Sequence, residues 1–156
     1  FDSAVGWRAL TGPTWLRGLP RYLWATLGEL IHLRTWDLTV NSDGQLQHQG
    51  PCLFASSLNT PTFGSGMPAV PHAQLKDGQL DALLAGTFDR LGVLLMLPRL
   101  LLGQHLSHPR VSSWPYGHLA IDCPQGVPLA ADGEYLGQAQ HASVRCQAAS
   151  LQVVCR

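Results

Sequence analysis

The fold is indicated most clearly by residues 36–48, which read WDLTVNSDGQLQH. Residues 36–40 alternate between apolar and polar side chains, as the two faces of a half-buried strand require. Residues 41–44 (Asn-Ser-Asp-Gly) are typical of a tight turn, and residues 45–48 return with mostly polar side chains. This stretch therefore predicts a β-hairpin.

Further short strands are expected along the rest of the chain. Residues 52–55 and 81–84 are brief apolar runs, and residues 56–67 between them form a loop rich in Ser, Thr, Pro and Gly. Beyond residue 111 the pattern predicts strands at 118–121, 127–130, 142–146 and 151–155, with turns at 124–126 and 132–133. Many short strands separated by turns favour an antiparallel sheet or sandwich.

Two helical segments accompany the strands. Residues 12–34 carry apolar side chains at helical spacing, and residues 88–102 form the most hydrophobic stretch. Pro98 is expected to kink or divide the second segment, whose side chains we interpret mainly as core. The chain is therefore expected to form one α+β domain over residues 1–156, mainly an antiparallel β-sandwich with a few helices.

The composition excludes several classes of protein. Hydrophobic residues make up 46% of the 156 residues and charged residues only 13%, which is typical of a globular rather than a disordered chain. Ten basic and ten acidic side chains cancel, which argues against binding to nucleic acid and gives no polybasic membrane patch. Any contact with lipid must then depend on apolar surface. No run of 18 apolar residues predicts a spanning helix.

The cysteines and the start of the chain give two further expectations. Cysteines at 52, 123, 146 and 155 have no CxxC spacing, so we interpret them as buried thiols in a reducing compartment. The start at Phe1 has neither an initiator Met nor the basic and apolar regions of a signal peptide. We therefore expect the sequence to be a piece of a longer protein.

Four local clusters could carry chemistry. Paired glycines at 64 and 66 permit close approach of a ligand, and an Asp-Gly turn within residues 74–81 offers the oxygen ligands that Mg²⁺ prefers. His105 and His108 invite a metal site, but Gly103 and Pro109 favour a loop. Residues 131–135 place two carboxylates around a glycine, as a general base and a cation ligand would need. Each cluster is also compatible with an ordinary turn or loop.

Taken in order, these clusters resemble the C-terminal domain of the diacylglycerol kinase/sphingosine kinase-like family, nearest its small bacterial lipid kinases. The resemblance covers nearly the whole chain. The matching motifs are residues 6–9, Tyr22, Asn59 with residues 64–67, and residues 71–73, 76–81, 103–105, 108–111 and 129–134.

The resemblance implies specific roles. Glu134 matches the family's proposed proton acceptor, and Asp132 is its companion near the phosphates. A Mg²⁺ site would use the Asp77 side chain and the main-chain carbonyls of Gln74 and Gln79, and would order the loop more than join the chemistry. Its affinity is expected to be low, because a lysine precedes Asp77 and its charge opposes a cation.

The remaining parts of the site follow from the same resemblance. Asn59, Gly64 and Gly66 are expected among the cofactor-binding residues, although a serine separates the glycines where the family usually has a third glycine. ATP with Mg²⁺ would be delivered by an N-terminal domain that is absent from this chain. The hydrophobic segment 88–102, with Trp15, Trp24 and Trp36, could line a channel for acyl chains.

The function implied is ATP-dependent phosphorylation of a lipid hydroxyl, with a diacylglycerol-like substrate. Diacylglycerol, phosphatidylglycerol and a sphingoid base all offer such a hydroxyl. The location implied is the cytoplasm, with peripheral contact at the inner membrane face. The alternative is a lipid-binding or regulatory module of the same fold without catalysis. An NAD kinase is disfavoured, because no Gly-Ser-Thr-Ala-Tyr-like stretch is present.

Overall fold

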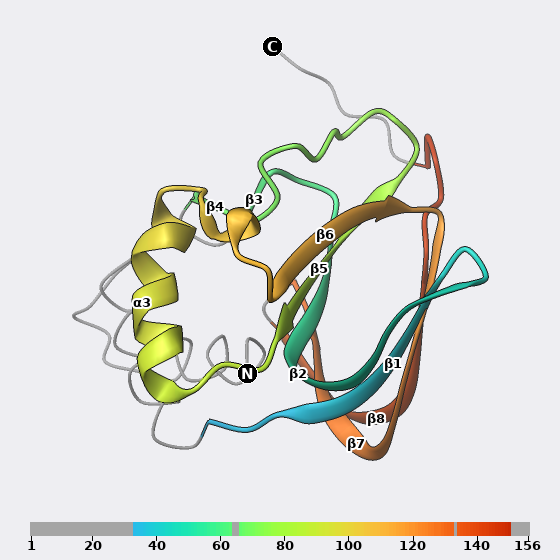
Figure 1. Cartoon of the computed structure of the whole chain (residues 1–156). Helices are drawn as coiled ribbons and strands as arrows, with labels where there is room; N and C mark the ends of the chain where they lie inside the picture. The colour runs from blue at the N-terminus through green and yellow to red at the C-terminus, as the bar shows by residue number, and fades with distance from the viewer. Residues whose placement is uncertain (1–32, 64–65, 133, 151–156) are drawn as a thin grey trace.

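The computed structural model describes residues 33–63, 66–132 and 134–150. They form a six-stranded antiparallel sheet in the order β6-β5-β2-β1-β7-β8 and a two-stranded sheet, β3-β4 (Figure 1). The large sheet consists of β1 (Trp36–Ser42), β2 (Gln45–Leu58), β5 (Leu80–Gly86), β6 (Val111–Tyr116), β7 (His118–Ala131) and β8 (Glu134–Arg145). The remaining elements are β3 (Thr62–Phe63), β4 (Met67–Pro68), α3 (Arg90–Leu101) and the 3-10 helix η1 (His105–Ser107). The expected α+β domain with a mainly antiparallel, sandwich-like sheet is confirmed.

The hairpin predicted from residues 36–48 is present. β1 and β2 pair antiparallel, with Ser42 opposite Gln45. The two residues of the turn, Asp43 and Gly44, have φ angles of 49° and 81°. Positive φ at both central positions is the geometry that follows the twist of the flanking strands, and an Asp-Gly pair adopts it readily.

Two pairs of predicted short strands are each one long strand. Residues 45–48 and 52–55 both belong to β2, whose first half pairs with β1 and whose second half pairs with β5. Residues 118–121 and 127–130 both belong to β7, and the turn expected at 124–126 is instead a bulge, where the register with β8 shifts. A bulge can accommodate Pro124, which lacks the N–H of a regular ladder, and a positive φ at Gly126.

The long strands let the sheet fold back on itself around an inner core. This core contains buried residues of β1, β2, β5, β6 and β7: Leu38, Val40, Cys52, Ala82, Leu84, Tyr116, Leu119 and Cys123. Alternate residues of β5, such as Leu83 and Ala85, face a second, helix-side core that also includes Val70, Phe88 and Val93. β5 is therefore buried on both faces, which explains its apolar run from Ala82 to Ala85.

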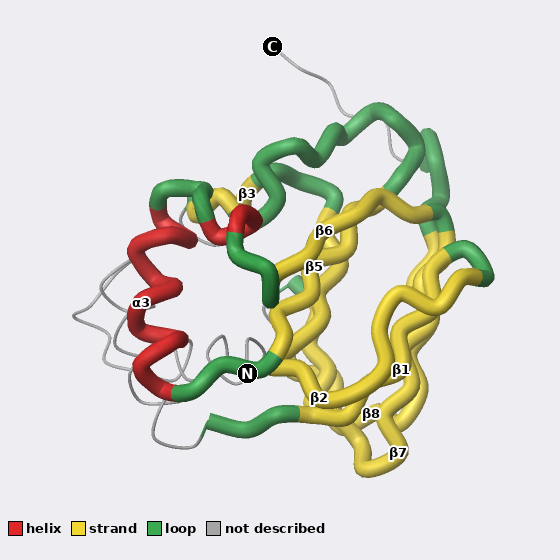
Figure 2. Tube along the Cα trace, viewed as in Figure 1, coloured by secondary structure: helices red, strands yellow, loops and turns green. Residues whose placement is uncertain are grey.

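Helix α3 lies beside the sheet (Figure 2). It begins at the N-cap Asp89, whose side chain accepts a hydrogen bond from the Gly92 N–H at 2.9 Å. Pro98 lies inside the helix without dividing it, because the proline is in the last turn and interrupts few hydrogen bonds. The interpretation of residues 88–102 as mainly core is wrong, since Val93 is the buried residue of α3 and several leucines are exposed.

The structure also bears on the cysteines and on the helices and strands expected near the ends of the chain. Cys52 and Cys123 are buried free thiols, Cys146 is half-buried, and burial raises the pKa of Cys52 to about 12. The helix expected at 12–34 falls almost entirely outside the described residues, as do Cys155 and the strand at 151–155. Within the described ranges, the helices are too short or too polar to span a bilayer.

Asp43 connects the first hairpin to the β6–β7 connection through hydrogen bonds. Its carboxylate accepts hydrogen bonds from the N–H groups of Gly117 (3.1 Å) and His118 (2.8 Å), and its own N–H donates to the His118 carbonyl.

Asp43→Ala should lower the free energy of unfolding by about 1–2 kcal/mol, because two backbone donors lose their charged acceptor. Urea unfolding checks this, with Asp37→Ala, an exposed change in the same hairpin, as the control. Equal stability of the two variants would contradict it.

Candidate functional site

The two carboxylates of residues 131–135 lie at the tip of the β7–β8 hairpin. Ala131 pairs with Glu134 across the two strands, and Asp132, which follows Ala131, has a φ of 49°. Asp and Asn tolerate this left-handed conformation better than most residues. Both Asp132 and Glu134 are exposed, so their side chains are accessible to a second domain or a ligand.

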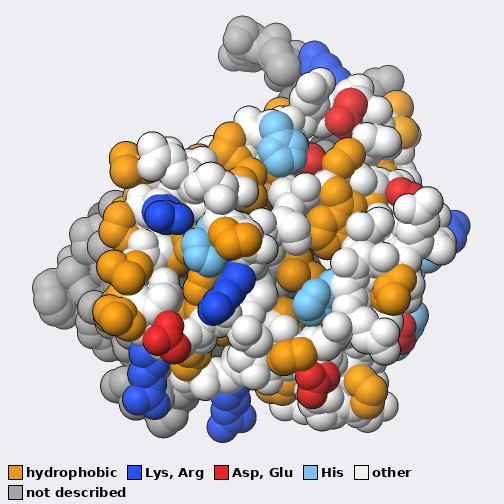
Figure 3. Space-filling model, in the orientation of Figure 1, with side chains coloured by type: hydrophobic (Ala, Val, Ile, Leu, Met, Phe, Trp, Pro, Cys, Tyr) orange, Lys and Arg blue, Asp and Glu red, His pale blue; other side chains and the backbone are white. Residues whose placement is uncertain are grey.

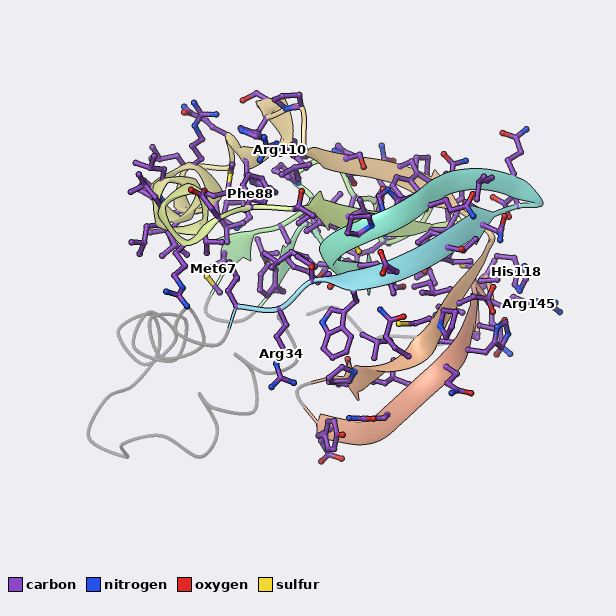
Figure 4. The ribbon with its side chains drawn as sticks, turned by 60° about the horizontal axis from the view of Figure 1, so that its bottom comes forward. Arg34, Met67, Phe88, Arg110, His118 and Arg145 are labelled. Atoms are coloured by element: carbon purple, nitrogen blue, oxygen red, sulfur yellow. The ribbon has the colours of Figure 1, made fainter. Side chains whose placement is uncertain are left out.

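The tip extends beyond the rest of the sheet. β1 pairs with β7 only over Leu119–Asp122, whereas the pairing of β7 with β8 continues to Glu134. In Figure 4 the two strands run from His118 and Arg145 toward the side of the molecule where Arg34 lies. The hairpin therefore presents its carboxylates at one end of the domain.

The loop that follows β2 carries the second cluster. Asn59 comes directly after β2 and is exposed, while Gly66 has a φ of 80° in the turn between β3 and β4. Gly64 lies outside the described residues. The segment after Gly66 is anchored, because Met67, Ala69 and Val70 are buried and the Val70 N–H donates to the Pro61 carbonyl at 3.1 Å.

The Asp-Gly turn of the expected metal site is also exposed. The Asp77 carboxylate accepts a hydrogen bond from the Gln79 N–H at 3.0 Å, and Gly78 has a φ of 76°. Asp81, at the start of β5, is 4% exposed, and its Oδ1 lies 3.5 Å from Nε2 of His72. Burial raises the pKa of Asp81, the charge of His72 lowers it, and the charge of Asp77 raises it.

The two carboxylate clusters are far apart. A Cβ built on Gly78 would lie 3.4 Å from the Cβ of Ala148, which follows the last residue of β8. Glu134 is the first residue of that 12-residue strand. At about 3.3 Å per residue, roughly 35 Å of strand separates them along the chain. Asn59, in contrast, follows Leu58, which pairs with Asp81, so it lies at the same sheet end as the Asp77 turn.

The donors around Asp77 suit a hard cation weakly. Carboxylate and carbonyl oxygens are the ligands that Mg²⁺ accepts, and the mutual repulsion of Asp77 and Asp81 would be relieved by a cation. Among the described residues, however, no three His, Cys, Asp or Glu side chains converge as a metal site. An ion at this turn would therefore depend on main-chain carbonyls, such as those of Gln74 and Gln79.

The histidines considered as metal ligands have other contacts. His105 is 3% exposed and its Nε2–H donates to the Ala69 carbonyl at 2.7 Å, which anchors η1 to the loop after β4. The ring of His108 lies 5.1 Å from that of Phe88, and its Nδ1 accepts from the Arg110 N–H. The expected loop contains the 3-10 helix η1. Its two histidines contact neighbouring parts of the domain, His105 through a hydrogen bond and His108 through a ring contact.

Sequence reasoning missed two pairs that the sheet assembles. The His72–Asp81 contact joins a loop residue to a strand residue, and nothing in their spacing predicts it. On β7 and β8, Asp122 and His141 lie opposite each other with a 2.7 Å contact between Oδ1 and Nδ1. The strand register could have predicted the second pair only if β7 had been recognised as one continuous strand.

Residues 1–155 match the family model described as the YegS C-terminal NAD kinase beta sandwich-like domain. Two curated proteins named diacylglycerol kinase, from Mycobacterium tuberculosis strains CDC 1551 / Oshkosh and ATCC 25618 / H37Rv, are 32% identical over 135 residues. The alignment covers 86% of this chain and 43% of each relative, so the chain spans less than half the length of these relatives.

Solved structures are similar in fold. Two solved structures from Bacillus anthracis str. Sterne, each provisionally named diacylglycerol kinase, align with TM-scores of 0.63 and 0.60. They cover 82% and 78% of this chain and 41% of each solved chain, at 15% and 14% identity. At such identities the likeness concerns the fold alone.

Proposed function

Because this chain belongs to the family of the YegS C-terminal NAD kinase beta sandwich-like domain, as its motifs predicted, we propose that it is the lipid-side half of an ATP-dependent lipid kinase. Relatives named diacylglycerol kinase place it in a lipid kinase family. A primary hydroxyl of a diacylglycerol-like lipid is the proposed acceptor, at the cytoplasmic face of the membrane. The proposed nucleotide-binding domain corresponds to the part of the relatives that this chain does not cover.

The observation that carries the proposal is the exposed carboxylate pair on the overhanging β7–β8 tip. Glu134 is the proposed acceptor of the hydroxyl proton as the oxygen attacks the γ-phosphorus of ATP, and Asp132 helps to hold a cation near the phosphates. An alcohol is far less acidic than a carboxylic acid, so the proton leaves late, as the new bond forms. Catalysis then consists mainly of positioning and neutralising charge.

The loop after β2 begins at the opposite end of the sheet from Glu134, so its residues would contact the same nucleotide only if the second domain extends along the length of the sheet. Asn59, Gly64 and Gly66 remain the proposed cofactor-binding residues, and the main chain at Gly66 is open to close approach. The Asp77 turn lies at the other end of β8 from Glu134, which supports a structural ion there rather than one that joins the chemistry. The ATP with its own cation and the structural Mg²⁺ of the Asp77 turn are thus proposed at two separate places.

Transfer of radiolabel from ATP tests the function. The full-length protein should label diacylglycerol in mixed micelles, with phosphatidylglycerol and a sphingoid base as competing acceptors. Preference for one acceptor would name the substrate. Binding of these lipids without any transfer, under conditions where a known lipid kinase is active, would favour the non-catalytic binding module instead.

Mg²⁺ should stabilise the protein through the Asp77 turn. At about 10 mM Mg²⁺ the Tm is expected to rise by roughly 1–3 °C, because an ion that binds only the folded state stabilises it. Asp77→Ala should abolish this rise. Lys76→Gln should enlarge it, since a positive charge beside the site is removed. If Asp77→Ala responds to Mg²⁺ as the parent protein does, the ion binds elsewhere.

A further inference from the structure

Helix α3 has a second apolar face, which the described residues of the domain do not cover. Leu91, Leu95 and Leu102 are 61%, 64% and 69% exposed, and Leu94 is 37% exposed. With Pro98 they follow a spacing of three or four residues, so at ~100° per residue they share one side of the helix. We call these five residues the leucine stripe.

The leucine stripe is not needed to attach α3 to the domain. Val93 is buried in the helix-side core and Met96 packs against it, and both lie on the opposite side of the helix. A helix that is apolar on both sides is normally covered on both sides. Exposed apolar patches of this kind mark surfaces that meet a partner or a membrane.

Basic side chains border the leucine stripe. By the same helical spacing, Arg90 and Arg99 lie at its two edges. Beside Arg99 is a hollow of about 490 Å³, bordered by Leu95 and Met96 of α3 and by His108 and Arg110 before β6. Figure 3 shows hydrophobic side chains over α3 with blue and pale blue side chains next to them.

One cation of the hollow, Arg110, is held in place by two contacts. Arg110 donates from a guanidinium nitrogen to the Thr87 carbonyl at 3.0 Å, and its Cζ lies 5.9 Å from the Phe88 ring centre (Figure 4). The acidic group in the hollow, Asp89, has a carboxylate oxygen engaged as the N-cap of α3. The hollow therefore presents Arg99 and Arg110 for an anionic group.

We propose that α3 docks on the surface of a bilayer that contains anionic lipids. The leucine stripe enters the boundary between headgroups and acyl chains, and Arg99 and Arg110 meet lipid phosphates at the rim, as in amphipathic helices that lie in this interface. The inference rests on the proposed function in one respect, since a lipid kinase must take its substrate from a membrane. The charges around the leucine stripe favour an anionic bilayer as the partner, because an apolar surface bordered by arginines complements anionic headgroups.

Vesicle binding of the full-length protein without nucleotide tests the apolar part. Vesicles of phosphatidylcholine with a third of phosphatidylglycerol should sediment the parent protein, and pure phosphatidylcholine vesicles should do so less. Leu95→Glu should weaken the partition coefficient at least tenfold. Leu46→Glu, at a leucine 57% exposed in β2, is the matched control and should change it less than twofold.

Charge variants test the headgroup part. Arg99→Gln should weaken binding to the anionic vesicles about fivefold, close to the effect of one basic residue at a membrane surface. Arg145→Gln, at the far end of the sheet from α3 in Figure 4, should have little effect. The Arg99 difference should disappear on pure phosphatidylcholine vesicles.

Unchanged vesicle binding by a folded Leu95→Glu protein would overturn the proposal. A lowered Tm of the same protein would then show that another part of the protein covers the leucine stripe. A Glu134→Gln protein should bind vesicles normally, so loss of kinase activity and loss of docking are separate outcomes.

Discussion

Replacing Glu134 by Gln in the full-length protein should lower lipid phosphorylation by about 10²–10⁴-fold, the usual contribution of a general base. The substitution keeps the size and hydrogen-bonding capacity of the side chain and removes its ability to take the proton. Because Glu134 is exposed at the end of a hairpin, the Tm should hardly change. The rate of label transfer at saturating ATP and lipid is the measurement.

Two companion variants sharpen this prediction. Asp132→Asn should reduce the rate less than Glu134→Gln, since its proposed part is to hold a cation. Asp37→Asn, at an exposed position of β1, should leave the rate unchanged. A Glu134→Gln enzyme that works at the normal rate would remove the base assignment while leaving the family intact.

The reversals of the chain could be predicted for a local reason. The turn at Asp43 and Gly44 depends on an Asp-Gly pair whose conformational preference acts over a few residues, and Asp132 adopts the same φ of 49° as Asp43. Local preference therefore predicted where the chain reverses and where the Glu134 carboxylate would be exposed. Such signals are independent of the rest of the fold.

The errors arose where distant contacts decide the structure. Pro124 and Gly126 have the composition of a turn, yet the β8 partner strand holds them in a bulge of one continuous β7. Pairing across strands overrides local preference in such cases. The Asp81–His72 pair likewise depends on the packing of a loop against β5, which the sequence does not specify.

The leucines of α3 illustrate a different limit. Apolar residues at helical spacing predict a buried face, but residues 90–102 are apolar at nearly every position, so the spacing cannot identify which face is buried. The structure assigns burial to Val93 and exposure to Leu91 and Leu95. Several of the apolar side chains that suggested a buried core consequently lie at the surface of α3.

Removal of the His105 side chain should have the largest effect on stability. Its Nε2–H donates to the carbonyl of Ala69, which is fully buried, and the neighbouring Leu106 packs against the helix-side core. His105→Ala leaves a buried carbonyl without its donor and creates a cavity, at a cost of about 2–3 kcal/mol. For a chain of this size the Tm should fall by roughly 4–12 °C.

The same residue should make stability depend on pH. Burial lowers the pKa of His105 from 6.5, and the hydrogen bond to Ala69 opposes this shift in part. The unfolded chain therefore binds a proton at His105 at a higher pH than the folded chain does. By linkage, stability is complete above about pH 6.5 and declines as the pH falls toward the lower pKa of the folded state.

His105→Gln separates the titration from the packing. Glutamine can still donate to the Ala69 carbonyl, and it removes the ring whose Nδ1 is buried with no hydrogen-bond partner among the described residues. Between pH 7 and pH 5 the Tm of His105→Gln should fall less than that of the parent protein, while Tm values at pH 7 should be closer to each other than to His105→Ala. Parallel Tm curves for His105→Gln and the parent protein would show that other groups cause the acid sensitivity.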